Sequence, residues 1–214
     1  MLYVDISHPI EDKMPVFPGT PEVKVSQFST VEIEGFAEKE LEIATHIGTH
    51  MDAPAHMISG GKTLDQYHVA DFTGLAYVIP FSLDDLDGVK QNEYLSQFED
   101  EIRKADFIIL KTDWSEKWGT KEYFKDYPAL DKTGAEYLSG FRIKGIGLDA
   151  ISIDQDNNDK YEAHQIVLGN QILIIENLCG LDKVRNQFIK LFVFPLKIVD
   201  ADGSPLRAVA EIKA

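Results

Sequence analysis

The stretch ATHIGTHMDAPAHM, residues 44–57, gathers several imidazole side chains and a carboxylate in one short segment. It holds three of the 6 histidines of this 214-residue chain and one aspartate: His46, His50, Asp52 and His56. All four occupy even positions, while the odd positions carry apolar or small residues. Because side chains alternate between two faces in an extended segment, the pattern predicts one polar face and one apolar face.

A straight strand would hold these side chains too far apart for a single ion. At about 3.3 Å per residue, His46 and His50 would lie about 13 Å apart, whereas ligand atoms lie about 2 Å from a bound metal. The segment must therefore curl, and we expect it to do so at Gly48 and Pro54, which also disfavour a regular helix. Neutral imidazole with carboxylate suits zinc or a similar transition ion. The stretch is predicted to form a metal site.

Composition limits the class of protein and its partners. The length and a 44% apolar content predict one globular domain over residues 1–214. A formal net charge of -15 disfavours nucleic acid and anionic membranes as partners. No apolar run spans a bilayer and no signal peptide is visible. Cys179 is the only cysteine, which excludes an intrachain disulfide and a thiolate zinc cluster and favours the cytoplasm.

Hydrophobic patterning predicts an α/β protein in which strands outnumber helices. Apolar runs or alternation predict strands in eight segments, namely 23–33, 39–50, 75–83, 105–114, 143–153, 171–178, 190–200 and 207–213. Helical spacing predicts one helix from an Asn92 cap and another from Asp131. Strands and helices interleave in the middle of the chain, which indicates a mixed sheet or a barrel-like core with flanking helices. GIGLDA, residues 145–150, resembles a dinucleotide fingerprint, but a continued strand rather than a helix is expected after it.

A second segment, EAHQIVLGNQILIIENL at residues 162–178, offers further ligands. Glu176 ends the apolar run QILII, and a carboxylate in a core strand is costly unless it is paired or coordinated. His164 precedes a predicted helix or loop. Each residue alone has an ordinary structural explanation, but together they could complete the site begun by the first segment.

Taken together, these segments resemble a known family. HIGTHMDAPAH, residues 46–56, matches the H-x-G-T-H-x-D-x-P-x-H signature of the cyclase family, which includes bacterial kynurenine formamidases and related metal-dependent hydrolases. The resemblance continues through residues 5–19, 111–114, 147–154 and 164–178. It implies an α/β sandwich or swivelling barrel that assembles as a homodimer or homotetramer.

The resemblance also assigns roles to the histidine-rich stretch. It implies that His46, His50 and Asp52 bind a first metal ion, with Asp52 also reaching a second ion. It makes His56 the proton donor or acceptor.

The more distant residues receive roles in the same way. The resemblance implies that His164 binds the second ion and that Glu176 bridges both ions. Kynurenine formamidases of this type carry a tryptophan before Pro-Gly that lines the aryl pocket. Phe17 stands at that position here, so an aromatic wall is kept while the indole N–H is lost.

The implied reaction is hydrolysis of a small-molecule amide, either an aryl formamide such as N-formylkynurenine or a related amide or lactam. One or two divalent ions per subunit, zinc or alternatively manganese, would activate water to hydroxide near neutral pH. His56 would then protonate the leaving amine. Two other classes stay open: a non-catalytic metal-bearing small-molecule binding protein, and an interaction protein with a structural metal. A closed structural zinc site often uses cysteines, so the single cysteine favours the enzyme.

Overall fold

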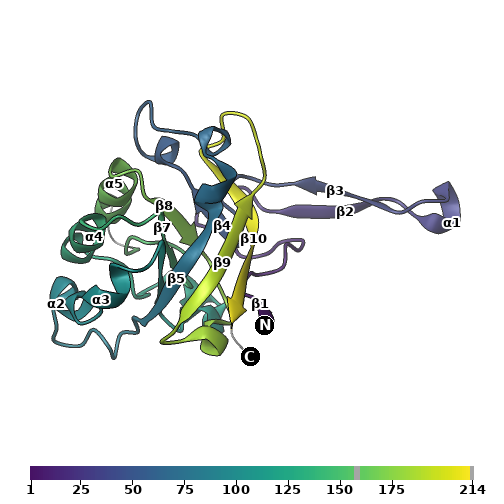
Figure 1. Ribbon diagram of the computed structural model, residues 1–214. Helices are drawn as coiled ribbons and strands as arrows, with labels where there is room; N and C mark the ends of the chain where they lie inside the picture. The colour runs from purple at the N-terminus through teal and green to yellow at the C-terminus, as the bar shows by residue number, and fades with distance from the viewer. Residues whose placement is uncertain (157–159, 213–214) are drawn as a thin grey trace.

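The computed structural model describes residues 1–156 and 160–212 as a closed barrel with helices on one side and a projecting arm (Figure 1). The barrel strands are β4 His50–Asp52, β5 Thr73–Pro80, β6 Phe107–Lys111, β7 Gly145–Leu148, β8 Leu173–Glu176, β9 Phe188–Pro195 and β10 Gly203–Ile212. A short strand, β1 Leu2–Asp5, pairs with β10 outside the ring. The helices are α1 Val31–Glu34, α2 Gln91–Ser96, α3 Glu99–Ile102, α4 Lys132–Ser139 and α5 Glu162–Gly169.

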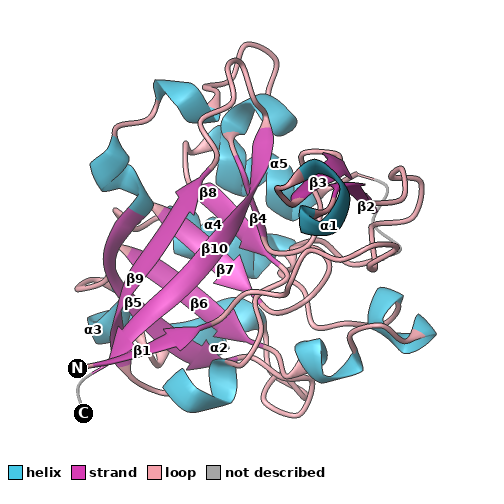
Figure 2. Ribbon diagram, turned by 90° about the vertical axis from the view of Figure 1, so that its right-hand side faces the viewer, coloured by secondary structure: helices cyan, strands magenta, loops and turns pink. Residues whose placement is uncertain are grey.

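The sheet is mixed and closes on itself through β10. Its strand order is β1-β10-β4-β8-β7-β6-β5-β9, and an additional β9–β10 pairing joins the ends of the ring (Figure 2). Strands β5, β6, β7 and β8 run parallel, whereas β4, β9 and β10 pair antiparallel with their neighbours. The predicted mixed, barrel-like core with flanking helices is therefore confirmed.

Strand alternation divides the apolar side chains into an interior set and an outer set. In β8, Leu173 and Ile175 pack inside the barrel with Met51 of β4. Ile174 belongs to the outer set, which packs against α2, α4 and α5. Because both faces of the parallel strands are covered, they appear in the sequence as continuous apolar runs. Glu176 follows the alternation of Ile174, so its carboxylate lies on the outer, helix-covered face.

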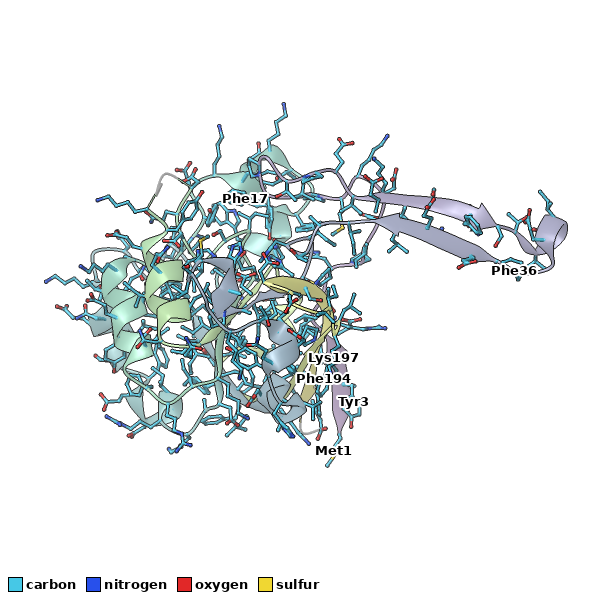
Figure 3. All side chains as sticks on the ribbon, turned by 90° about the horizontal axis from the view of Figure 1, so that it is seen from above. Met1, Tyr3, Phe17, Phe36, Phe194 and Lys197 are labelled. Atoms are coloured by element: carbon cyan, nitrogen blue, oxygen red, sulfur yellow. The ribbon has the colours of Figure 1, made fainter. Side chains whose placement is uncertain are left out.

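Strands β2 Lys24–Ser29 and β3 Glu38–Glu42 form an antiparallel hairpin that leaves the body as an arm, with α1 at its tip (Figures 1 and 3). The strand predicted for residues 23–33 is therefore too long, because β2 ends at Ser29. Residues 31–34 make one helical turn that ends at Gly35, whose φ of 80° suits a glycine. Large apolar side chains of the arm are exposed, including Phe28, Ile33 and Phe36.

The strand predicted for residues 39–50 is also divided. Strand β3 ends at Glu42 and β4 begins only at His50, because the chain turns at Gly48. Near the C-terminus, β9 ends at Pro195, so residues 196–200 are not a strand. The final predicted strand lies within β10, except that residue 213 falls outside the described part of the chain.

The strand predicted for residues 143–153 is wrong after residue 148, because side-chain hydrogen bonds replace the strand pairing there. Strand β7 ends at Leu148, and the next residue, Asp149, accepts hydrogen bonds from the backbone and hydroxyl of Thr112. Ile153 donates its backbone N–H to Glu176 instead of to a strand. Residues 149–156 contain no helix, so the helix that a dinucleotide fingerprint requires does not follow β7 directly.

The two helix predictions differ in accuracy. Asp131 caps α4 as predicted, since its carboxylate accepts from the Gly134 backbone N–H at 2.8 Å. The other helix begins two residues earlier than predicted, with Lys90 rather than Asn92 at the cap position, and breaks into α2 and α3. None of the helices in the described ranges is long and apolar enough to cross a membrane.

Candidate metal centre

The histidine-rich stretch curls at the two predicted points. Gly48 has a φ of 54°, and a Cβ there would lie 2.8 Å from the Met14 methyl group, so both conformation and space favour glycine. After β4, Pro54 begins a short 3-10 turn that ends at His56. The turn brings the His56 ring back over the ring of His46, with 4.0 Å between their centroids.

Antiparallel pairing of β4 with β8 joins the two distant segments. In this register His50 lies opposite Glu176, and their Nε2 and Oε2 atoms are 3.6 Å apart. His164 lies in the first turn of α5 rather than before the helix. Its Nε2 lies 3.5 Å from Oε1 of Glu176 and 3.7 Å from Oδ2 of Asp52. The sheet and one helix thus bring together residues more than a hundred positions apart.

The Asp52 and Glu176 carboxylates each face histidines on two sides. One oxygen of each carboxylate points toward the side of His50, and the other points toward His164. Oδ1 of Asp52 faces His46 Nδ1 at 2.7 Å and His50 Nε2 at 3.3 Å, while its Oδ2 faces His164. Glu176 likewise directs Oε2 toward His50 and Oε1 toward His164. This arrangement has the form of two adjoining ligand sets that share Asp52 and Glu176.

In His46, His50 and His164, the ring nitrogen that points away from the shared carboxylates lies within hydrogen-bond distance of another oxygen atom. His50 Nδ1 lies 2.8 Å from the Gly48 carbonyl oxygen. His164 Nδ1 lies 2.6 Å from Asp154, and His46 Nε2 lies 2.9 Å from Asp202.

Because these oxygens can only accept, each ring donates through that nitrogen and directs its other nitrogen toward Asp52 or Glu176. Metal-binding histidines are oriented by such partners in many proteins.

The burial of the two carboxylates, Asp52 and Glu176, indicates whether a cation would fit between them and the histidines. Asp52 is completely buried, and its Oδ2 has no hydrogen-bond partner among the described residues. Burial, with the charge of Asp52, raises the pKa of Glu176 to about 7. Two buried carboxylates this close need positive charge beside them, and their imidazole neighbours are nitrogen ligands that suit divalent transition ions. The residues present therefore fit one or two divalent ions.

Protons supply part of that charge in the metal-free protein. Burial lowers the pKa of His46, but Asp52 and Asp202 outweigh it and raise the pKa to about 9. Burial is likewise outweighed at His164, where Asp154 and Asp52 raise the pKa to about 10. Metal ions bind deprotonated ligands, so they would displace these protons.

Two residues of this cluster were not predicted from the sequence, Asp154 and Asp202. Asp154 follows β7 and caps the start of α5, accepting from the backbone N–H groups of Ala163 and His164. Asp202 lies just before β10, 156 residues from its partner His46. Asp154 stands in a segment already matched to the family, but Asp202 carries no local signal because an Asp-Gly pair ordinarily indicates only a turn.

A cavity of about 230 Å³ opens beside this cluster. Its polar wall includes His46, His50, His56, His164 and Glu176, and its apolar wall includes Val16, Phe17, Met57 and Ile151. Phe17, predicted to contact substrate, thus lies in the cavity wall. Figure 3 labels this residue on the body of the molecule, away from the tip of the arm. The two tryptophans pack elsewhere: Trp114 donates to the Tyr123 carbonyl oxygen and Trp118 stacks on His8.

Comparison with known proteins agrees with this geometry. A family model described as a putative cyclase matches residues 4–155. Kynurenine formamidase from Bacillus cytotoxicus is 31% identical over 209 residues, covering 97% of this chain and 96% of that protein.

Solved structures give the same result. An isatin hydrolase bound to the product analogue thioisatinate superposes with a TM-score of 0.88 at 25% identity, covering 99% of this chain and 92% of that one. A predicted metal-dependent hydrolase from Bacillus stearothermophilus superposes with a TM-score of 0.79 at 26% identity, covering 98% and 97%.

The barrel, its candidate metal-binding cluster and these matches define the chain as an enzyme of the hydrolase class. It belongs to the Cyclase family, which confirms the resemblance drawn from residues 46–56.

Removing charge from a shared carboxylate tests the candidate metal centre. We expect Asp52→Asn and Glu176→Gln each to reduce the zinc bound per chain, because a neutral amide oxygen is a weaker ligand. Elemental analysis of the purified proteins after dialysis measures the change. Glu162→Gln, an exposed change in the first turn of α5, is the matched control and should bind as much zinc as the unaltered protein. Full zinc content in both site variants would contradict the assignment.

The pKa shifts predict how pH acts on the metal-free protein. His46 and His164 hold protons up to about pH 9 and 10 when folded, against 6.5 for the ordinary side chain. Since the folded state then binds more protons than the unfolded state, their stabilising contribution is complete below pH 6.5 and is lost as the pH rises through these values.

We therefore expect the melting temperature of the chelator-treated protein to fall between about pH 7 and pH 10, and that of the zinc-loaded protein to change less. Thermal melts at a series of pH values measure both. A melting temperature that rose with pH in the metal-free protein would contradict the raised pKa values.

Proposed function

We propose that this protein is a metal-dependent hydrolase that cleaves a carbonyl–nitrogen bond in a small aryl amide or lactam. The observation that carries the proposal is the pair of buried carboxylates, Asp52 and Glu176, each facing histidines on two sides at the wall of a cavity. Zinc is the proposed ion, because imidazole and carboxylate together suit it, and manganese is the alternative.

Each residue has a separate part in this proposal. His46, His50 and His164 would hold the ions together with the two shared carboxylates. When bound, divalent ions polarise a carbonyl oxygen and lower the pKa of a water molecule toward neutrality. Asp52, His164 and Glu176 are buried, and charge interactions are stronger in such a poorly solvated environment than in water.

His56 is the proposed proton carrier. Its ring lies 4.0 Å from the His46 ring and 5.8 Å from the His164 ring, at the cavity wall. Burial lowers the pKa of His56, so the side chain is neutral at pH 7 and can accept a proton. It can then return that proton to the departing amine, as general acid–base catalysis requires.

The cavity wall supports an aromatic substrate. Phe17 offers a flat apolar surface in the wall of the same cavity, and Met57 and Ile151 add apolar area to that wall. The similarity to kynurenine formamidase favours an aryl formamide, whereas the similarity to isatin hydrolase favours a bicyclic aryl lactam. Both substrates place a hydrolysable carbonyl–nitrogen bond beside an aromatic ring.

A substrate panel tests the proposal. Zinc-loaded and manganese-loaded protein would be incubated with N-formylkynurenine, formanilide and isatin, and hydrolysis followed by absorbance. Turnover of an aryl formamide or lactam that disappears with a chelator and returns with the ion is the expected result. Stoichiometric zinc without turnover of any of these compounds would instead favour a metal-bearing binding protein.

Loss of the proton carrier should separate catalysis from metal binding. We expect His56→Ala to keep its zinc while kcat falls by about 10²–10⁴-fold, the usual contribution of general acid–base catalysis. Steady-state kinetics and elemental analysis measure the two effects. His68→Ala removes an exposed histidine outside the cavity and should change neither. A His56→Ala protein that lost its zinc would show that His56 is a ligand.

We also propose that the protein acts as a homodimer or homotetramer in the cytoplasm. The projecting arm supports the assembly, since two-stranded hairpins are marginally stable alone and its Ile33 and Phe36 are 81% and 52% exposed. A second copy covering these side chains would stabilise the arm. Light scattering should give at least twice the chain mass, and Ile33→Ser with Phe36→Ser should shift it toward the monomer. A monomeric unaltered protein would refute the assembly.

A further inference from the structure

The loop that precedes β10 is fixed on both sides of Asp202. The backbone carbonyl of Asp202 accepts from the Ala53 N–H at 2.8 Å, just beyond the end of β4. The neighbouring Ala201 carbonyl accepts from the Leu64 N–H at 2.9 Å. On the other side, Gly203 pairs in register with Asp52, and a Cβ on this glycine would overlap the His46 ring. The loop backbone is therefore held tightly against the imidazole cluster.

One carboxylate oxygen of Asp202 faces two imidazoles. Its Oδ2 lies 2.9 Å from His46 Nε2 and 3.5 Å from His56 Nδ1. The other oxygen, Oδ1, accepts from the Thr45 hydroxyl at 3.2 Å, which limits rotation of the carboxylate. The two rings lie nearly face to face, with 33° between their planes. Asp202 is the one described carboxylate that touches both a proposed metal ligand and the proposed proton carrier.

Its position differs from that of the shared carboxylates. The Asp202 side chain is 42% exposed, whereas that of Asp52 is completely buried. Asp202 also contacts the nitrogen of His46 that points away from Asp52. It therefore stands behind the histidines, outside the set of atoms that could surround an ion.

We propose that Asp202 is a positioning residue that orients His46 toward the metal and His56 toward the substrate, an inference that rests on the proposed hydrolase function. A carboxylate can only accept, so its contact with His46 Nε2 keeps that nitrogen protonated and leaves Nδ1 free to face Asp52. The same oxygen favours a proton on His56 Nδ1 and leaves Nε2 to exchange protons with the reactants. Orienting partners of this kind are worth about 10–100-fold in metal affinity or activity.

The isosteric change Asp202→Asn tests the proposal in the zinc-loaded full-length protein. Asp200→Asn is the matched control, because Asp200 is exposed in the same loop and asparagine tolerates its φ of 57°. For Asp202→Asn we expect zinc affinity, measured by competition with a chelating dye, to weaken about 10–100-fold. At saturating zinc, kcat should fall in the same range while KM is unchanged.

A readout independent of turnover follows the imidazoles directly. In ¹⁵N-labelled, zinc-loaded protein, the His56 Nδ1–H signal should be present and should be lost or shifted in Asp202→Asn, with Asp200→Asn like the unaltered protein. If no compound in the substrate panel is hydrolysed, the proposed function fails, but zinc affinity and the His56 signal still decide the role of Asp202. An effect on only one histidine, or only a lower melting temperature, would overturn the proposal.

Discussion

The structure depends on keeping two carboxylates, Asp52 and Glu176, buried side by side. Like charges in a poorly solvated place repel strongly and are tolerated only when cations or hydrogen bonds compensate them. The chain supplies His46 and His50 on one side and His164 on the other. In the metal-free protein, protons on these rings provide positive charge, and a divalent ion can replace them. The same arrangement that would destabilise the fold thus creates a candidate site for metal.

The closed sheet makes this arrangement rigid. Strand β4 contributes only three residues, yet it is held between β8 and β10, so its two polar side chains cannot shift along the sheet. Met51 between them packs inside the barrel and fixes the alternation. A register slip of one residue would reverse the two faces. The apolar interior therefore determines which side of β4 presents His50 and Asp52.

A further set of acceptors orients the histidines. The Gly48 carbonyl, Asp154 and Asp202 each accept from the ring nitrogen that points away from the shared carboxylates. These acceptors come from a kinked loop, the cap of α5 and the turn before β10. Each imidazole therefore has one defined direction before any ion or substrate binds. Membership of the Cyclase family and this preorganisation agree in pointing to hydrolysis.

The sequence by itself was sufficient for local features. Alternation in residues 46–56 predicted which side chains share a face, and the conformational limits of Gly48 and Pro54 predicted where the segment curls. The motif then gave the family, and through it the distant His164 and Glu176. Only the tertiary structure revealed the contact of Asp202 with His46 and the end of β7 before Asp149. Both depend on contacts with residues far along the chain. Periodicity reports on neighbours in sequence, whereas the closing of a barrel decides which distant side chains meet.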